Sequence, residues 1–192
     1  LDPDTRFAAR LEVARILGLI EERGGRIGVP RANLEEQPGH EASVEGLAGL
    51  LSSRGRHEEL AELYTTQAGE VEQQGDVRRA ANLWARAAAL FEEQLGDVKR
   101  ALEAHRRVVT LEPSAVSLDA LARLHLERDE PAVAAEWLAR RLEAADEPEK
   151  GAVGLRLADA HLRAGQAADA TRVLERMVEA DPAASEARAR LA

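Results

Sequence analysis

Alanine recurs along this chain at nearly constant intervals, and this recurrence constrains the fold more than any other feature of the sequence. Ala14, Ala48, Ala88, Ala122 and Ala158 are separated by 34, 40, 34 and 36 residues. An apolar or small residue precedes each of these marker alanines. A bulkier residue follows three positions later, and these residues are Leu17, Leu51, Phe91, His125 and His161. Because a small side chain lets two helices approach closely, this spacing predicts a series of similar helical hairpins.

The clearest hairpin lies within residues 80–113. Apolar and small residues at helical spacing predict its first helix, and they are Leu83, Trp84, Ala87, Ala88 and Phe91. Gly96 can then serve as a helix C-cap, and Asp97 can accept hydrogen bonds from the free N–H groups of the next helix. The second helix is expected to end at Pro113, because proline cannot continue a helix.

Two further landmarks recur in register with the marker alanines. A small or apolar residue opens each second helix, and a larger one follows four positions later, giving the pairs Leu60 and Tyr64, Ala101 and His105, Ala134 and Leu138, Ala170 and Leu174. The expected turns are Gly55-Arg56, Gly96-Asp97, Asp129-Glu130-Pro131 and Gly165-Gln166. Four hairpins therefore follow one pattern.

The clearest hairpin also resembles a known family. Its key residues are Trp84, Ala87, Ala88 and Phe91, then Ala101, His105 and Pro113, at the spacing of the tetratricopeptide repeat. The resemblance is to a divergent, bacterial-type form, in which alanine replaces glycine, histidine replaces phenylalanine, and the turn has one extra residue. It implies an all-α fold, a right-handed superhelical solenoid of antiparallel helical hairpins.

We expect one solenoid domain over residues 1–192, with repeats at about 4–38, 41–74, 76–113, 115–145 and 148–182 and a partial capping helix at 183–192. The first repeat departs from the pattern, because Gly28 and Pro30 interrupt its second half. A loop, with a short helix from Pro30 to Glu36, is predicted there after a helix from Asp4 to Arg23. Since the chain begins at Leu1 without methionine, we also expect it to be a module of a larger protein.

Composition argues against several classes of partner. The net charge of -9 disfavours nucleic acid, and basic residues are scattered among glutamates rather than clustered. No apolar run reaches the roughly 18 to 20 residues that cross a bilayer, so membrane insertion is not expected. The absence of cysteine removes thiolate chemistry and disulfides. The compartment stays open, with the cytoplasm slightly favoured, and the oligomeric state is not indicated.

No catalytic, cofactor-binding or metal-binding residue is predicted, and the chain is not expected to be an enzyme. His105, His125 and His161 occupy positions where the repeat places packing residues, which favours a structural role over metal binding. Gly24-Gly25-x-x-Gly28 lacks the Lys-Ser/Thr of a phosphate loop and follows a helix rather than a strand. No serine lies in a nucleophile motif.

The resemblance implies a protein-interaction scaffold that holds a peptide or a helix of an unidentified partner in a concave groove lined by first helices. The residues that it places in this groove are Asn82, Ala85, Ala89, Asp119, Arg123, Leu126, Leu155, Asp159 and Leu162. The Lys and Asn that clamp a terminal carboxylate in chaperone-tail binders of the family are missing, both at Ala85 and Ala89 and at Asp119 and Arg123, which disfavours a cochaperone role.

Two other functions stay open. The chain could be a structural or regulatory segment attached to a catalytic or sensor domain elsewhere in the same protein. It could also be an RNA-binding helical repeat like the related pentatricopeptide proteins, although the acidic charge balance argues against this alternative.

Overall fold

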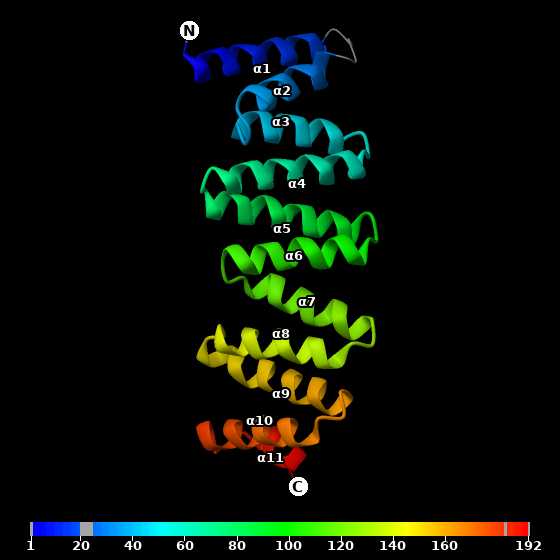
Figure 1. The fold of residues 1–192 in the computed structure, drawn as a ribbon, viewed down its shortest axis with the longest axis vertical. Helices are drawn as coiled ribbons and strands as arrows, with labels where there is room; N and C mark the ends of the chain where they lie inside the picture. The colour runs from blue at the N-terminus through cyan, green and yellow to red at the C-terminus, as the bar shows by residue number, and fades with distance from the viewer. Residues whose placement is uncertain (1, 20–24, 183, 192) are drawn as a thin grey trace. The chain divides into compact units, whose positions relative to one another are not determined.

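The computed structural model describes residues 2–19, 25–182 and 184–191, and within these ranges every regular element is a helix. The fold is all-α, as predicted (Figure 1). Its helices form two compact units, Leu1–Glu112 and Pro113–Ala192, each described here by itself. One solenoid domain over the whole chain stays a prediction.

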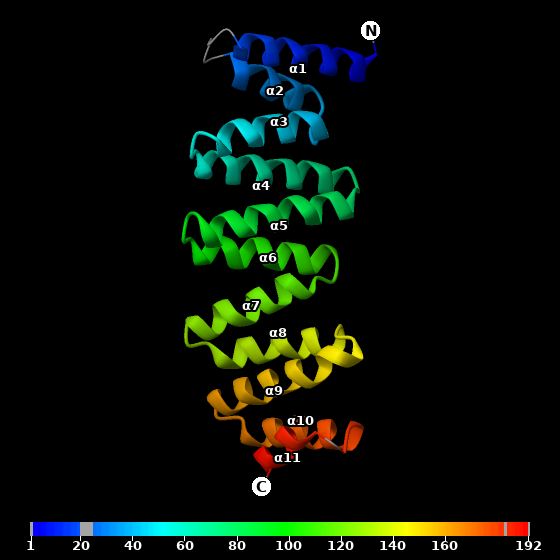
Figure 2. The same ribbon diagram turned by 180° about the vertical axis from the view of Figure 1, so that it is seen from behind.

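The first unit consists of three helical hairpins. Consecutive helices run in opposite directions and lie side by side, as Figures 1 and 2 show from opposite sides. Their bounds are α1 Pro3–Leu19, α2 Gly25–Glu36, α3 Glu41–Ser52, α4 His57–Gln73, α5 Val77–Glu93 and α6 Val98–Leu111. The odd-numbered helices are the first helices of their hairpins, and the even-numbered helices are the second.

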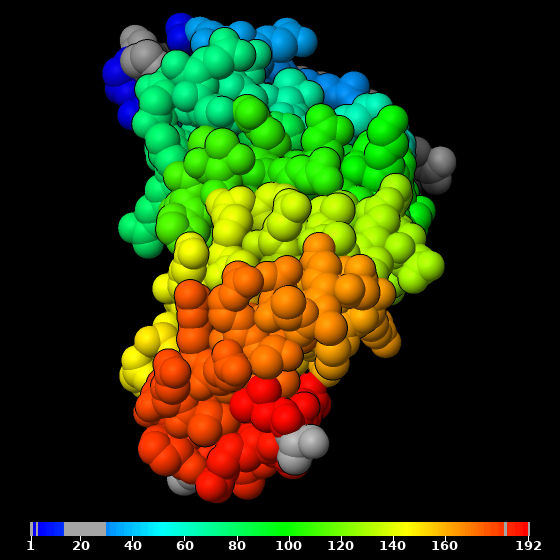
Figure 3. All heavy atoms as spheres, turned by 60° about the horizontal axis from the view of Figure 1, so that its bottom comes forward, coloured from blue at the N-terminus to red at the C-terminus, as the bar shows by residue number. Residues whose placement is uncertain are grey.

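The second unit contains two hairpins and a short last helix. Its helices are α7 Ala115–Glu127, α8 Pro131–Glu143, α9 Glu147–Arg163, α10 Ala167–Ala180 and α11 Ser185–Leu191. Ala187 of α11 is buried in a cluster with Ala158, Ala170 and Leu174. Figure 3 shows the red side chains of α11 against the orange side chains of this end of the unit, where α11 covers an apolar face.

The marker alanines lie in the interior of their units. Ala48 is 4% exposed, and Ala88, Ala122 and Ala158 are fully buried. The residues that open the second helices, and the larger residues four positions later, are buried as well. These four alanines are therefore interior, as the predicted contacts between paired helices require, whereas the side chain of Ala14 lies outside the described residues.

The turns of the hairpins also lie where the sequence predicts them. Gly55, Gly96 and Gly165 have φ values of 65°, 63° and 74°, and Asp129 has a φ of 57°. This left-handed conformation ends one helix and redirects the chain into the next. Asp97 then accepts a hydrogen bond from the backbone N–H of Arg100, as expected of an N-cap residue.

Replacing Asp97 by alanine should lower the free energy of unfolding at neutral pH by about 1 kcal/mol, because the cap of α6 is lost. The backbone and side-chain hydrogen bonds from Arg100 hold the pKa of Asp97 below its usual range. The contribution of the carboxylate is therefore complete above the ordinary pKa of aspartate and is lost as the pH falls through the lowered value. Urea unfolding at neutral and acidic pH should show the gap between wild type and Asp97→Ala closing in acid. An equal gap at both pH values would contradict this account.

The structure corrects the prediction for the second half of the first repeat. Residues Gly25–Glu36 form a continuous helix that contains Pro30, instead of a loop with a short helix. Pro30, Asn33 and Leu34 share one face of this helix, and all three are buried. Burial of that face outweighs the cost of a proline within the helix, because propensity is a weak preference that tertiary packing overrides.

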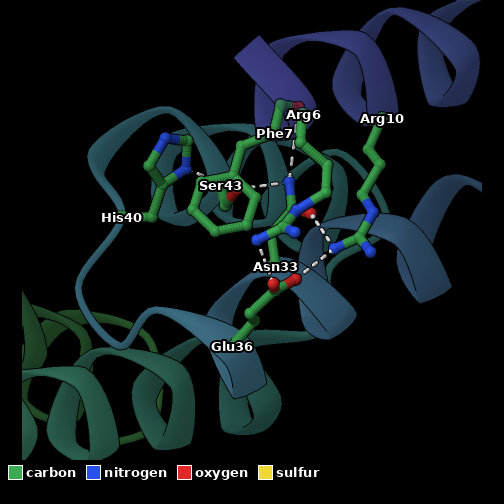
Figure 4. Close-up of polar contacts among 7 residues, drawn as sticks. All are labelled: Arg6, Phe7, Arg10, Asn33, Glu36, His40 and Ser43. Atoms are coloured by element: carbon green, nitrogen blue, oxygen red, sulfur yellow. Dashed lines mark hydrogen bonds and ion pairs between the residues drawn. The ribbon is translucent and has the colours of Figure 1, made fainter. Parts of the chain in front are cut away.

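Polar contacts tie α2 to its neighbours on both sides (Figure 4). The amide of Asn33 donates to Ser43 Oγ of α3 at 3.1 Å, and its carbonyl oxygen accepts from Arg10 of α1 at 3.3 Å. Arg10 also donates to Glu36 at 2.7 Å, while the Phe7 ring lies 4.8 Å from that of His40. Asn33 is completely buried, so these hydrogen bonds satisfy a group that is costly to bury alone.

Candidate functional site

The candidate residues of the first unit lie on α5. Asn82 and Ala89 are exposed there, and Ala85 is half-buried. The neighbouring Arg86 donates to both carboxylate oxygens of Glu45 on α3, and its guanidinium lies 4.3 Å from the centre of the Tyr64 ring. This contact with Arg86 lowers the pKa of Glu45, whereas burial raises the pKa of Tyr64.

The candidate residues of the second unit lie on α7 and α9. Arg123, Asp159 and Leu162 are exposed, and Leu162 keeps 52% of its surface. The other three are half-buried: Asp119, Leu126 and Leu155. Leu126 packs on the core formed by α7, α8 and α9, and Leu155 packs on the core formed by α9, α10 and α11.

Two of these candidates link consecutive first helices. Asp119 on α7 accepts from Arg156 on α9 at 2.6 Å, and it also accepts from the buried Arg141 on α8 at 3.1 Å. Asp159 on α9 pairs with Arg190 on α11. Arg123 pairs with Glu127 within its own helix at 2.8 Å. Asp119 and Asp159 therefore have a structural contact in addition to any role in binding.

Arginines form similar bridges between second helices. Arg100 of α6 donates to Glu58 of α4 at 3.0 Å, and Arg107 of α6 donates to Glu72 of α4 at 2.6 Å. The side-chain hydrogen bond from Arg100 lowers the pKa of Glu58. Each bridge joins equivalent helices of neighbouring hairpins, so these charges help to hold the repeats in register.

Three histidines combine packing with polar contacts. His105 and His125 are buried, and His161 is half-buried. His125 Nδ1 lies 2.6 Å from Glu130 Oε2, and His161 Nδ1 lies 2.8 Å from Gln166 Oε1. Both contacts join the end of a first helix to the turn after it. A hydrogen bond from Arg128 and a smaller contribution from the one with His125 lower the pKa of Glu130 to about 2.

The sequence did not predict the cleft that lies between α2 and α4. Its volume is about 420 Å³, and α3 lies at its bottom. The lining residues are Arg31, Leu34, Glu35, Pro38, Leu47, Leu51, Glu59, Glu62, Leu63, Thr66, Gln67 and Glu70. A short helix from Pro30 to Glu36 was predicted where α2 lines the cleft, but the sequence did not indicate that this helix lies beside α4. The apolar residues Leu34 and Pro38, on either side of the end of α2, were the one sequence feature that could have indicated an apolar surface here.

Family comparison identifies one repeat directly. Residues 43–78 match the model of the tetratricopeptide repeat. The chain carries this repeat. The matched segment covers most of α3 and all of α4, and the marker alanine Ala48 lies within it. The tetratricopeptide assignment predicted from residues 80–113 is confirmed, and the same hairpin pattern continues beyond the matched segment.

Solved structures of tetratricopeptide proteins resemble this chain along almost its whole length. A tetratricopeptide repeat protein from Parabacteroides merdae matches with a TM-score of 0.53 and 16% identity, over 96% of this chain and 72% of its own. A putative kinesin light chain with TPR-like repeats from Podosopora anserina matches with a TM-score of 0.51 and 20% identity, over 95% and 99%. MamA protein matches with a TM-score of 0.50 and 12% identity, over 96% and 94%. At these identities the comparison shows the fold alone.

No curated protein matches the sequence. No group of three potential metal ligands occurs in the part of the chain that the structure describes. Among those same residues, no helix is both long and apolar enough to cross a membrane. The tetratricopeptide fold is in general a protein–protein interaction module.

Proposed function

We propose that the first helices within each unit form a binding face for an extended peptide or a helix of a partner protein. The observation that supports the proposal is the exposure of the residue after each marker alanine. Gly49, Ala89, Arg123 and Asp159 are all exposed, although the alanine before each is buried. Each of these hairpins thus leaves the same register position open to solvent, and Ala89, Arg123 and Asp159 present a side chain there, as a repeated binding surface requires.

The two units offer different chemistry on this face. Asn82, Ala85 and Ala89 are small, so a bound segment can approach α5 closely. The second unit presents the guanidinium of Arg123 and the exposed apolar side chain of Leu162. A partner segment with an acidic and an apolar side chain fits the second unit best. The acidic side chain can pair with Arg123, and the apolar side chain can pack on Leu162. Tetratricopeptide folds are typically not catalytic, and we propose a binding role alone.

Reversing the charge of Arg123 is the sharpest test of this face. Asp159 is a poorer choice, because its reversal also breaks the pair with Arg190. Arg123→Glu disrupts the exposed pair with Glu127 within α7, and a pair of this kind contributes about 0.3 to 0.5 kcal/mol. We expect the variant to retain about tenfold less of the wild-type partners in a quantitative pull-down, because a contact of the binding face becomes repulsive.

Arg172→Glu on the second helix α10 is the matched control. Arg172 is also exposed and is also paired within its own helix, with Asp169. The Arg172→Glu variant should retain the wild-type partners. Circular dichroism should show equal helix content in both variants. If Arg123→Glu and Arg172→Glu retain the same partners in the same amounts, the proposal that the first helices form the binding face is wrong.

A further inference from the structure

The cleft between α2 and α4 lies on the second-helix side of the first unit, away from the proposed first-helix face. Both helices run in the same direction (Figure 1). Two contacts cross from the α2 segment to α4. Arg31 pairs with Glu59 at 3.2 Å, and the backbone N–H of Gly39 donates to Gln67 Oε1 at 2.6 Å. The contacts are eight residues apart on both sides, and most of the cleft lies between them.

The inner part of the cleft is apolar. Leu34, Leu47 and Leu51 line its bottom and are 6%, 2% and 1% exposed. Leu63 and Pro38 line it as well and are only half-buried. An apolar side chain entering the cleft would therefore cover Leu63 and Pro38 without disturbing the core beneath them.

The remaining lining residues make the cleft acidic. Glu35, Glu62 and Glu70 have no side-chain partner within the described residues, and Arg31 is the only basic residue of the lining. Glu59 already pairs with Arg31 and with Arg56. The next pair of second helices differs, because Arg100 and Arg107 of α6 bridge to carboxylates of α4. Among the residues that the structure describes, the α2–α4 interface has one such bridge, from Arg31 to Glu59, where the α4–α6 interface has two.

We propose that this cleft binds a short basic amphipathic segment of a partner protein. One apolar side chain of the segment lies against Leu63 and Pro38, and flanking arginines or lysines pair with Glu35, Glu62 and Glu70. The volume of about 420 Å³ matches the size of clefts that enclose such groups. Guanidinium groups suit this role, because they form paired hydrogen bonds with carboxylates while their stems cover apolar surface.

A fluorophore in the cleft reports binding at this site. The chain has no cysteine, so Thr66→Cys provides a unique labelling position in the exposed part of the cleft lining. Thr110→Cys on α6 provides the same label at an exposed position outside the lining. The probe is a synthetic peptide with leucine and arginine at helical spacing. The comparison peptides carry glutamine in place of arginine, or alanine in place of leucine.

We expect the leucine–arginine peptide to change the fluorescence of the label at position 66 in a saturable manner and to leave the label at position 110 unchanged. Both comparison peptides should bind about tenfold more weakly, because each lacks one of the two contacts. Binding should also weaken as the salt concentration rises. Equal binding of all three peptides would overturn the proposal, and so would equal changes at both labels.

Charge reversal separates the cleft from the overall acidity of the protein. Glu62→Lys combined with Glu70→Lys should weaken the binding of the leucine–arginine peptide about tenfold or more. Glu93→Lys combined with Glu103→Lys changes the net charge equally at exposed residues outside the cleft lining, and it should bind as the wild type does. Equal weakening by both pairs would mean that net charge alone attracts the peptide, which contradicts a cleft site.

Sedimentation of the unlabelled protein tests whether a second copy of this chain, rather than a partner segment, occupies the cleft. We expect the oligomeric state to be the same for wild type and for the Glu62→Lys, Glu70→Lys variant. A wild-type dimer that the variant converts to a monomer would overturn the proposal in favour of a second copy of this chain. Neither result changes the first-helix face, because its test uses Arg123 of the other unit.

Discussion

Replacing Gly39 by alanine should lower the free energy of unfolding by about 2 to 5 kcal/mol. Gly39 is buried and has a φ of 76°, a conformation that costs alanine about 1 to 2 kcal/mol. An alanine Cβ at this position would also overlap Cγ2 of the buried Val71. Because Val71 is a stiff β-branched residue, relief of the overlap has to displace α4 or the turn after α2, which adds about 1 to 3 kcal/mol.

Gly55→Ala separates the two costs of the Gly39 substitution. Gly55 has a similar φ of 65°, but nothing lies within contact of an added Cβ. Urea unfolding followed by circular dichroism should give a loss of about 1 to 2 kcal/mol for Gly55→Ala, from the backbone conformation alone. If the two variants lose equal stability, then Gly39 does not pack against Val71 as described here.

Replacing Ala88 by leucine should lower the free energy of unfolding by about 1 to 3 kcal/mol, because it overpacks the contact between paired helices. Ala88 is fully buried at the position where the repeat requires a small side chain. The larger side chain has to push α5 away from its neighbours or adopt a strained rotamer. The measurement is again the urea unfolding curve.

Ala89→Leu is the matched control, since it makes the same substitution at the next residue of the same helix. Ala89 is exposed, so the expected change in stability stays within about 0.5 kcal/mol. A neutral Ala88→Leu, or equal losses for both variants, would show that the assigned register of the hairpins is wrong.

The sequence predicted the hairpins well where local chemistry decides their geometry. The turns at Gly55, Gly96 and Gly165 contain glycine, which favours the left-handed conformation. The turn at Asp129 comes shortly before Pro131, which starts the next helix. Such turns can be recognised from single residues. The buried alanines were predictable for a similar reason. A repeated small residue has one simple explanation when it recurs with the length of a hairpin.

Only the second half of helix α2 was predicted, because the stability of the full helix comes from residues distant in the sequence. Gly28 and Pro30 weaken it locally. The hydrogen bonds of Asn33 with Ser43 and Arg10 connect three helices. No local pattern distinguishes an asparagine that forms such a network from one in a loop, where asparagine is common.

The candidate binding residues were predicted only by position. The sequence placed Arg123 and Leu162 on first helices, and both are exposed there. It did not reveal that Asp119 and Asp159 pair with Arg156 and Arg190, because these partners are 37 and 31 residues away. Pairing between charges in different hairpins depends on the relative placement of the helices, which composition and spacing do not specify.

Thiol accessibility tests most directly the central claim that small side chains build the contacts between paired helices. Single cysteines can replace Ala48, Ala88, Ala122 and Ala158, and separately the residues that follow them, in a chain with no cysteine of its own. We predict modification about a hundredfold or more slower at the four alanine positions, because reaction there requires local opening that costs about 3 kcal/mol or more. Equal modification rates at the alanine positions and at the positions after them would contradict the account.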